Sequence, residues 1–147
     1  MNVDDRESAR WDRIDLTLSE LASRLALLEE LGRRGRKAFD DSDTLISLAA
    51  HSLLIQIGEA AKDLPENFRA HYPGVKWKPL IATRDRAAHV YNLIDWDVIF
   101  TTIERDIPSD SAGVRAIIAE RLANDRRVLD SIERLNSGKG DVHELLD

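Results

Sequence analysis

Five side chains that could carry out chemistry lie within eight residues of one another: Arg84, Asp85, Arg86, His89 and Tyr91. A histidine can accept or donate a proton near neutral pH, and an arginine can stabilise negative charge on phosphoryl oxygens. On a helix, Asp85 and His89 share a face, so the carboxylate can hold one imidazole nitrogen. These residue types fit RNA cleavage by the neighbouring ribose hydroxyl. That reaction needs no metal, because its nucleophile belongs to the substrate.

The spacing of Arg84 and His89 leaves their arrangement open. Five residues place two side chains about 140° apart on a regular helix, so these two do not converge within one turn. Either the helix unwinds near His89, or two copies of the segment meet across a symmetric dimer. A third interpretation is a surface ion-pair network with a structural role alone.

Charge is distributed unevenly along the chain. The net charge is −6, yet residues 69–89 contain five basic residues and one acid. A local cationic patch suits a polyanion, and we expect Lys76, Lys78 and Arg86 to bind the RNA backbone. The same patch would also suit an acidic protein partner.

Apolar residues recur with the helical period along most of the chain, and no segment alternates convincingly with a period of two. We therefore predict an all-α fold, an antiparallel bundle of four to five helices. Pro65 and Pro108 are expected to end helices, and Ser109 and Asp110 to cap the last one. The predicted helices span about 11–31, 41–64, 77–90, 96–107 and 109–135, with 65–74 irregular.

The second predicted helix should be the central and most buried one, because its apolar residues surround most of its circumference. Residues 41–43 can cap its start. Glu59 is then a carboxylate near its inner end, which either pairs with a cation or faces water. His51 in the same helix is interpreted as a core histidine that a backbone carbonyl satisfies.

Size and composition predict one domain over residues 1–137 and a mobile tail at 138–147. The chain has 147 residues, 43% of them apolar, and no cysteine, which excludes disulfides and thiolate metal sites. The N-terminus lacks the apolar core of a leader peptide, and no apolar run could span a bilayer. We expect a cytoplasmic protein without membrane contact, metal or other cofactor.

The motif and its flanks resemble the HEPN family (higher eukaryotes and prokaryotes nucleotide-binding), and specifically its HepT-like toxin branch. That branch carries an arginine, four to six residues, a histidine, one residue and a tyrosine, matched by Arg84, His89 and Tyr91. The similarity covers roughly residues 42–108. It includes Ile57-Gly58-Glu59-Ala60-Ala61 before the motif, Pro73 and Trp77 ahead of it, and Asp95 and Asp106-Ile107-Pro108 after it.

This resemblance implies a helical homodimer whose two motifs face one cleft and cleave cellular RNA without metal. Arg84 and His89 would be the catalytic pair, Asp85 would orient them, and Arg86 and Glu59 would support the site. The implied partner is a minimal nucleotidyltransferase antitoxin that silences the toxin by adding nucleotide to Tyr91. The alternative is a non-catalytic helical dimer that binds nucleotide or serves as an adaptor for a nucleotidyltransferase.

Overall fold

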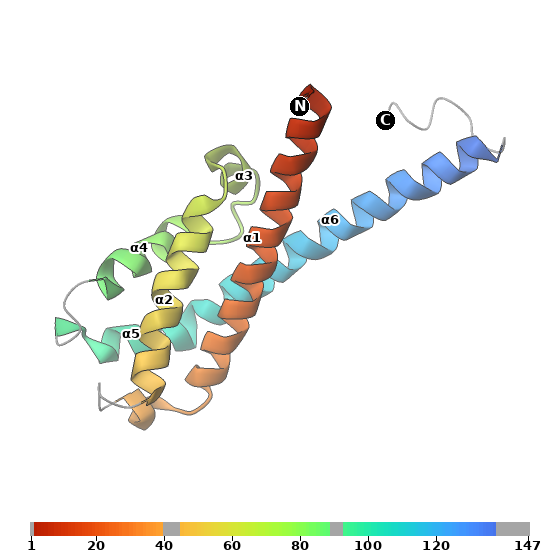
Figure 1. The fold of residues 1–147 in the computed structure, drawn as a ribbon. Coiled ribbons are helices and arrows are strands. Elements are labelled where there is room, and N and C mark those ends of the chain that lie inside the picture. Colours follow the sequence, from red (N-terminus) through yellow and green to blue (C-terminus); the bar gives the residue numbers. More distant parts are fainter. Residues whose placement is uncertain (1, 40–44, 89–92, 138–147) are drawn as a thin grey trace. The chain divides into compact units, whose positions relative to one another are not determined.

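The computed structural model describes residues 2–39, 45–88 and 93–137, which contain six α-helices, the 3-10 helix η1 and no strand (Figure 1). The predicted all-α class is confirmed. The predicted caps at 41–43, the tail at 138–147, His89 and Tyr91 lie outside the described residues. In chain order the elements are α1 (Val3–Gly32), η1 (Arg36–Phe39), α2 (Leu45–Asp63), α3 (Glu66–His71), α4 (Trp77–Ala87), α5 (Trp96–Arg105) and α6 (Ile107–Asn136).

The chain divides into two compact units, residues 1–115 and 116–147, and the division falls within α6. The first unit contains α1 to α5 and the first turns of α6, together with every predicted site residue. The second unit contains the rest of α6. A single domain over residues 1–137 stays a prediction.

Helix α1 buries the apolar face that the spacing predicts, but it begins earlier than expected. Its buried residues step by four, three, four and three: Ile14, Leu18, Leu21, Leu25 and Leu28. Trp11 was expected to join this face, and it is 38% exposed. The helix begins at Val3, where the Asn2 and Asp5 side chains each accept a hydrogen bond from the other residue's backbone. This capping box starts the helix. The first turn is polar, so the spacing of apolar residues did not predict it.

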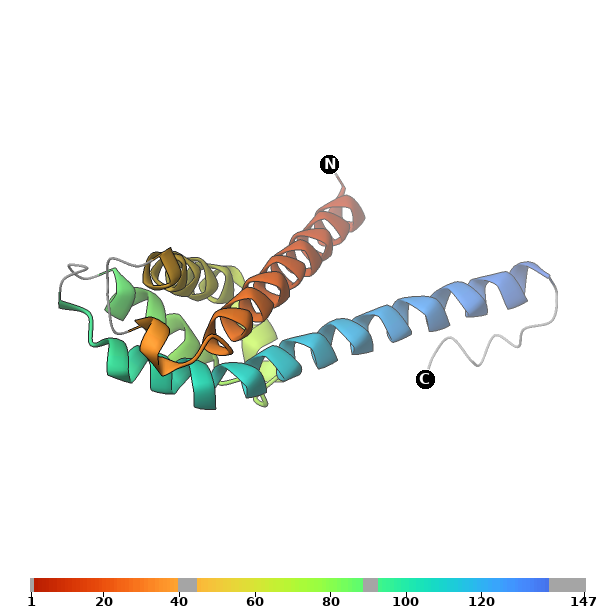
Figure 2. The ribbon, with the colours of Figure 1, turned by 90° about the horizontal axis from the view of Figure 1, so that it is seen from below.

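Helix α2 packs antiparallel against both α1 and α4 (Figures 1 and 2). The Arg24 Nε donates to Gln56 Oε1 at 2.8 Å, and Arg10 reaches Asn67 at 3.4 Å, so α1 and the α2–α3 segment run in opposite directions. The predicted central place of α2 is therefore confirmed. The expectation that the apolar residues around most of its circumference are buried is wrong at its start, where Leu45 is 85% and Leu48 is 47% exposed.

Two predicted boundaries near prolines are wrong. Residues 65–74 were expected to be irregular, but Pro65 is the N-cap of the short helix α3. Pro108 was expected to end a helix, and it lies instead in the first turn of α6. Proline is tolerated there because a first-turn amide has no partner within the helix.

Asp110 links α6 to the start of α4 rather than capping α6 as predicted. It is buried within the first turn of α6, and its Oδ1 accepts from the Lys76 backbone N–H at 3.0 Å. Burial raises the pKa of Asp110 above its ordinary value, which the hydrogen bond from Lys76 partly offsets. The contact fixes the beginning of the helix that carries Arg84.

In the described part of the chain, every helix is too short or too polar to cross a membrane.

Candidate active site

Arg84 lies where α4 crosses α2 at close range. The crossing point on α2 is Gly58, which is buried. A Cβ atom added to Gly58 would lie 2.3 Å from the Arg84 Cβ and 3.0 Å from its backbone nitrogen. Only a residue without a side chain allows two helices to approach so closely. The backbone of Arg84 is therefore positioned directly by α2.

The guanidinium of Arg84 lies between two carboxylates. Its Nε is 3.4 Å from Glu59 Oε1, and its Nη1 is 3.4 Å from Asp85 Oδ1. The Arg84 side chain is 37% exposed, and those of Glu59 and Asp85 are 53% and 72% exposed. Long, exposed ion pairs of this kind are weak, so the guanidinium can exchange a carboxylate for a phosphate at small cost. The sequence left open whether Glu59 pairs with a cation or faces water, and in the structure it does both.

The helix that carries Arg84 ends shortly after it. Helix α4 begins at Trp77 as predicted and ends at Ala87, three residues before the predicted end, with Ala88 as its C-cap. The separation of about 140° between Arg84 and His89 assumed a regular helix through His89. The described helix ends at Ala87, before His89. His89 itself lies outside the described residues, so the predicted angle stays a prediction.

The other predicted cations do not gather around Arg84. Lys76 is the N-cap of α4, eight residues before Arg84, and its Nζ lies 3.7 Å from Asp106 Oδ1. Lys78 and Arg86 are exposed on α4. Relative to Arg84 they are rotated by roughly 120° and 160° around the helix axis. The structure therefore brings Arg84, Glu59 and Asp85 together and leaves Lys76, Lys78 and Arg86 on other parts of α4.

A second contact between α2 and α4 involves His51. Its Nε2 lies 2.6 Å from the carbonyl oxygen of Ala87, the last residue of α4. The prediction that a backbone carbonyl satisfies His51 is confirmed.

The sequence analysis did not predict a role for Gly58. A glycine within an apolar helix and directly before a carboxylate was nevertheless a signal for a close helix crossing.

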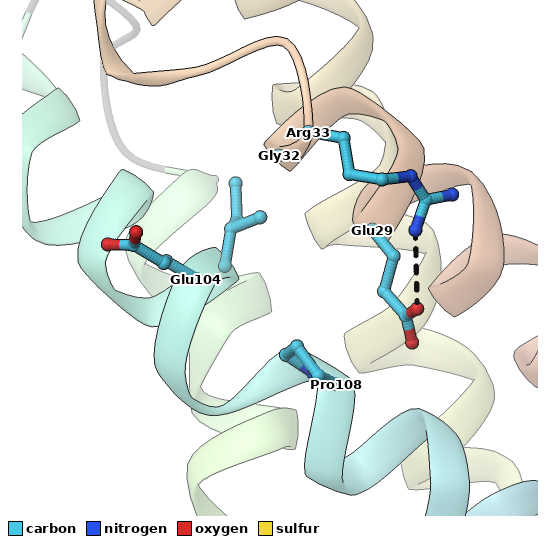
Figure 3. Close-up of a pocket in the computed structure, with 6 residues that line it drawn as sticks. Glu29, Gly32, Arg33, Glu104 and Pro108 are labelled. Carbon is cyan, nitrogen blue, oxygen red and sulfur yellow. Dashed lines mark ion pairs between the residues drawn. The ribbon is translucent and has the colours of Figure 1, made fainter.

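A surface pocket of about 380 Å³ lies elsewhere, between the end of α1, α5 and the start of α6 (Figure 3). The nearest cations to Glu29 are Arg33, at 3.9 Å from Oε2, and Arg115, at 4.0 Å from Oε1. None of the predicted site residues that the structure describes lines this pocket, and Arg84 is not among its lining residues. Its lining residues are Glu29, Gly32, Arg33, Ile103, Glu104 and Pro108.

Among the described residues, no group of three or more histidine or acidic side chains converges as metal ligands would. The chemical groups at the crossing of α2 and α4 are a guanidinium and two carboxylates. Fold and site together define an all-α protein with an accessible arginine fixed at a helix crossing.

Comparison with known proteins identifies the family. The profile of the family described as "Ribonuclease HepT-like" matches residues 21–117. The "Probable ribonuclease HepT" of Thermococcus cleftensis is 33% identical over 94 residues, which are 63% of this chain and 84% of that protein. No solved structure matches the chain with significance.

Two further relatives carry names of candidate RNases. One, from Methanocaldococcus jannaschii, is 38% identical over 64 residues, which are 44% of this chain and 53% of that protein. The other, from Caldanaerobacter subterraneus subsp. tengcongensis, is 34% identical over 83 residues, which are 55% of this chain and 74% of that protein. The chain belongs to the HepT-like ribonuclease family. The predicted resemblance and the predicted ribonuclease class are confirmed.

Proposed function

We propose that this ribonuclease cleaves RNA internally, without metal, by attack of a ribose 2′-hydroxyl on the adjacent phosphorus. Arg84 stabilises the charge that builds on the phosphoryl oxygens, and His89 transfers a proton. The observation that carries the proposal is the guanidinium of Arg84, fixed at its backbone by the close crossing with Gly58 and exposed enough to meet a phosphate. This residue lies within the part of the chain that matches the ribonuclease family.

The reaction needs one charge stabiliser and proton transfer at two oxygens. The 2′-oxygen forms a bond to phosphorus and releases its proton, while the bond from phosphorus to the 5′-oxygen breaks and that oxygen takes up a proton. His89 serves at one of these oxygens. The guanidinium of Arg84 leaves Glu59 and Asp85 to bind the phosphoryl oxygens, where a bidentate contact is strong. The products are a 2′,3′-cyclic phosphate end and a 5′-hydroxyl end.

The test is RNA cleavage by the purified protein in the presence of EDTA, with analysis of the new ends. We expect the cleavage rate to be unchanged by the chelator and the 3′ fragments to begin with a 5′-hydroxyl. Activity that disappears in EDTA and returns with Mg²⁺, or products with 5′-phosphate ends, would contradict the mechanism.

The proposal includes a homodimer that forms through the exposed apolar start of α2. Leu45 and Leu48 lie within about 60° of Glu59 around the helix axis, so one face of α2 carries all three. Helix α4 runs antiparallel to α2 and ends opposite His51. Leu48 precedes His51 by three residues, which is about one helical turn, so it lies near the end of the helix that carries Arg84. A two-fold contact at these leucines would bring two copies of that helix end together.

Leu48→Glu is expected to separate the dimer into monomers and to remove most of the RNA cleavage. Two glutamates facing each other across a two-fold axis should raise the dissociation constant roughly 100-fold or more. Sedimentation and cleavage assays measure the two effects. The control is Leu16→Glu, on the 63%-exposed Leu16 of α1, which should change neither. A Leu48→Glu protein that stays dimeric would place the interface elsewhere.

The proposed regulation is modification by a minimal nucleotidyltransferase that acts as antitoxin. Addition of nucleotide to Tyr91 would place phosphates near the cations of the motif and block the substrate. Intact-mass measurement after coexpression with such a partner should reveal the added nucleotide on the wild type and none on Tyr91→Phe. A Tyr91→Phe protein that the partner still modifies and silences would refute this assignment.

A further inference from the structure

Helix α2 holds the end of α4 at two points. Gly58 meets Arg84, and His51 meets the carbonyl of Ala87. His51 and Gly58 are seven residues apart, which is close to two helical turns, so they lie on the same face of α2. The contact at Gly58 sets the distance between the helices. The contact at His51 is directional, because it is a hydrogen bond of 2.6 Å.

The direction of this hydrogen bond follows from its acceptor. A backbone carbonyl can only accept, so the Nε2 of His51 carries the proton and donates it. The carbonyls of the last helical turn have no partner within their own helix. His51, half-buried on α2, therefore satisfies a carbonyl at the end of α4.

We propose that His51 is a positioning residue for catalysis, which acts by fixing the last turn of α4 through Ala87. This inference rests on the proposed function, in which Arg84 and His89 are the catalytic pair. Arg84 lies three residues before Ala87, in the turn that His51 holds. One contact on α2 thus restricts the turn that carries Arg84.

Two variants of His51 test the proposal. His51→Leu removes the donor, and we expect kcat to fall roughly 10- to 100-fold with KM changed less than about threefold, because misplacement affects the transition state most. In His51→Gln the amide Nε2 can donate to Ala87 from a similar position, and we expect it to restore kcat to within about threefold of the wild type. The pH profile of His51→Gln should match the wild type, since His51 transfers no proton to the substrate.

Controls separate this role from stability and from the proposed function itself. Ile14→Val removes a buried methyl group from α1, so it should lower stability and leave kcat unchanged at a temperature where all variants are folded. Wild-type kcat in folded His51→Leu would overturn the inference. A His51→Gln protein as inactive as His51→Leu would also overturn it, because a proton-transfer role would then be favoured. Arg84→Ala is measured in parallel. If Arg84→Ala retains activity, the proposed function fails. If Arg84→Ala is inactive and His51→Leu is active, only the role of His51 fails.

Discussion

Arg84→Ala is expected to lower the rate of RNA cleavage by at least roughly 100-fold while the helical fold persists. Removing one preorganised group that stabilises transition-state charge costs about 2.7–4 kcal/mol, which corresponds to that range of rates. The ion pairs of the guanidinium with Glu59 and Asp85 are long and exposed, so the free energy of unfolding should change by less than about 1 kcal/mol when they are removed. Cleavage assays in EDTA and thermal unfolding measure the two quantities.

Two further substitutions sharpen this experiment. Arg84→Lys keeps the positive charge but loses the planar fork that contacts two phosphoryl oxygens, so we expect an intermediate loss of about tenfold. Arg105→Ala makes the same change of charge at an exposed residue of α5 and should leave the rate nearly unchanged. Cleavage by Arg84→Ala at the wild-type rate would remove Arg84 from the catalytic site.

The sequence predicts the parts of the fold that repeat with the helical period. The apolar face of α1 is an example, since Ile14 to Leu28 are spaced as a buried helix face requires and are buried. The polar first turns of α1 and the short helix α3 were missed, because neither has an apolar period. A capping box at Asn2 starts one of them, and a proline N-cap at Pro65 starts the other. Pro108 was assigned to the end of one helix and lies instead in the first turn of the next, because proline occurs both after helices and in their first turns.

The site was predictable in its residue types and less so in its geometry. Arg84 stood out because it is spaced from His89 and Tyr91 as in the HepT-like motif. The pairing of Arg84 with Glu59 spans 25 residues of sequence and depends on how two helices cross, which no local pattern specifies. The same applies to Gly58, whose missing side chain matters only because Arg84 lies against it. Helix period predicts which face of α2 is buried, but not which residue of α4 meets it.

Gly58→Ala is expected to lower both stability and activity, although the same change in an open helix would stabilise it. Alanine favours a helix over glycine by about 1 kcal/mol. Here the new methyl group would lie 2.3 Å from the Arg84 Cβ and 3.1 Å from its Cα, atoms that no side-chain rotation can move away. Apolar atoms need about 3.5–4.0 Å, so α4 must shift by roughly 1 Å. Overpacking of this kind costs about 1–3 kcal/mol, and it should exceed the gain in helix propensity.

The matched control for stability is Gly74→Ala. A Cβ at Gly74 meets nothing within 4 Å, so the same chemical change there should leave unfolding and cleavage nearly unchanged. Urea unfolding of both variants measures the difference. Gly58→Ala with wild-type stability and wild-type cleavage would mean that α4 can move away from α2 without consequence, and that the crossing does not position Arg84.

A double variant decides whether Gly58 affects catalysis through Arg84. A displacement of about 1 Å in a catalytic group can reduce a rate roughly 100-fold, so Gly58→Ala alone should approach the loss seen in Arg84→Ala. If Gly58 acts only by placing the guanidinium, Gly58→Ala should add little further loss of cleavage on an Arg84→Ala background, because there is no guanidinium left to misplace. Two losses that multiply instead would show that the displaced helix disturbs a second group, and the segment that follows Ala87 would then be the place to look for it.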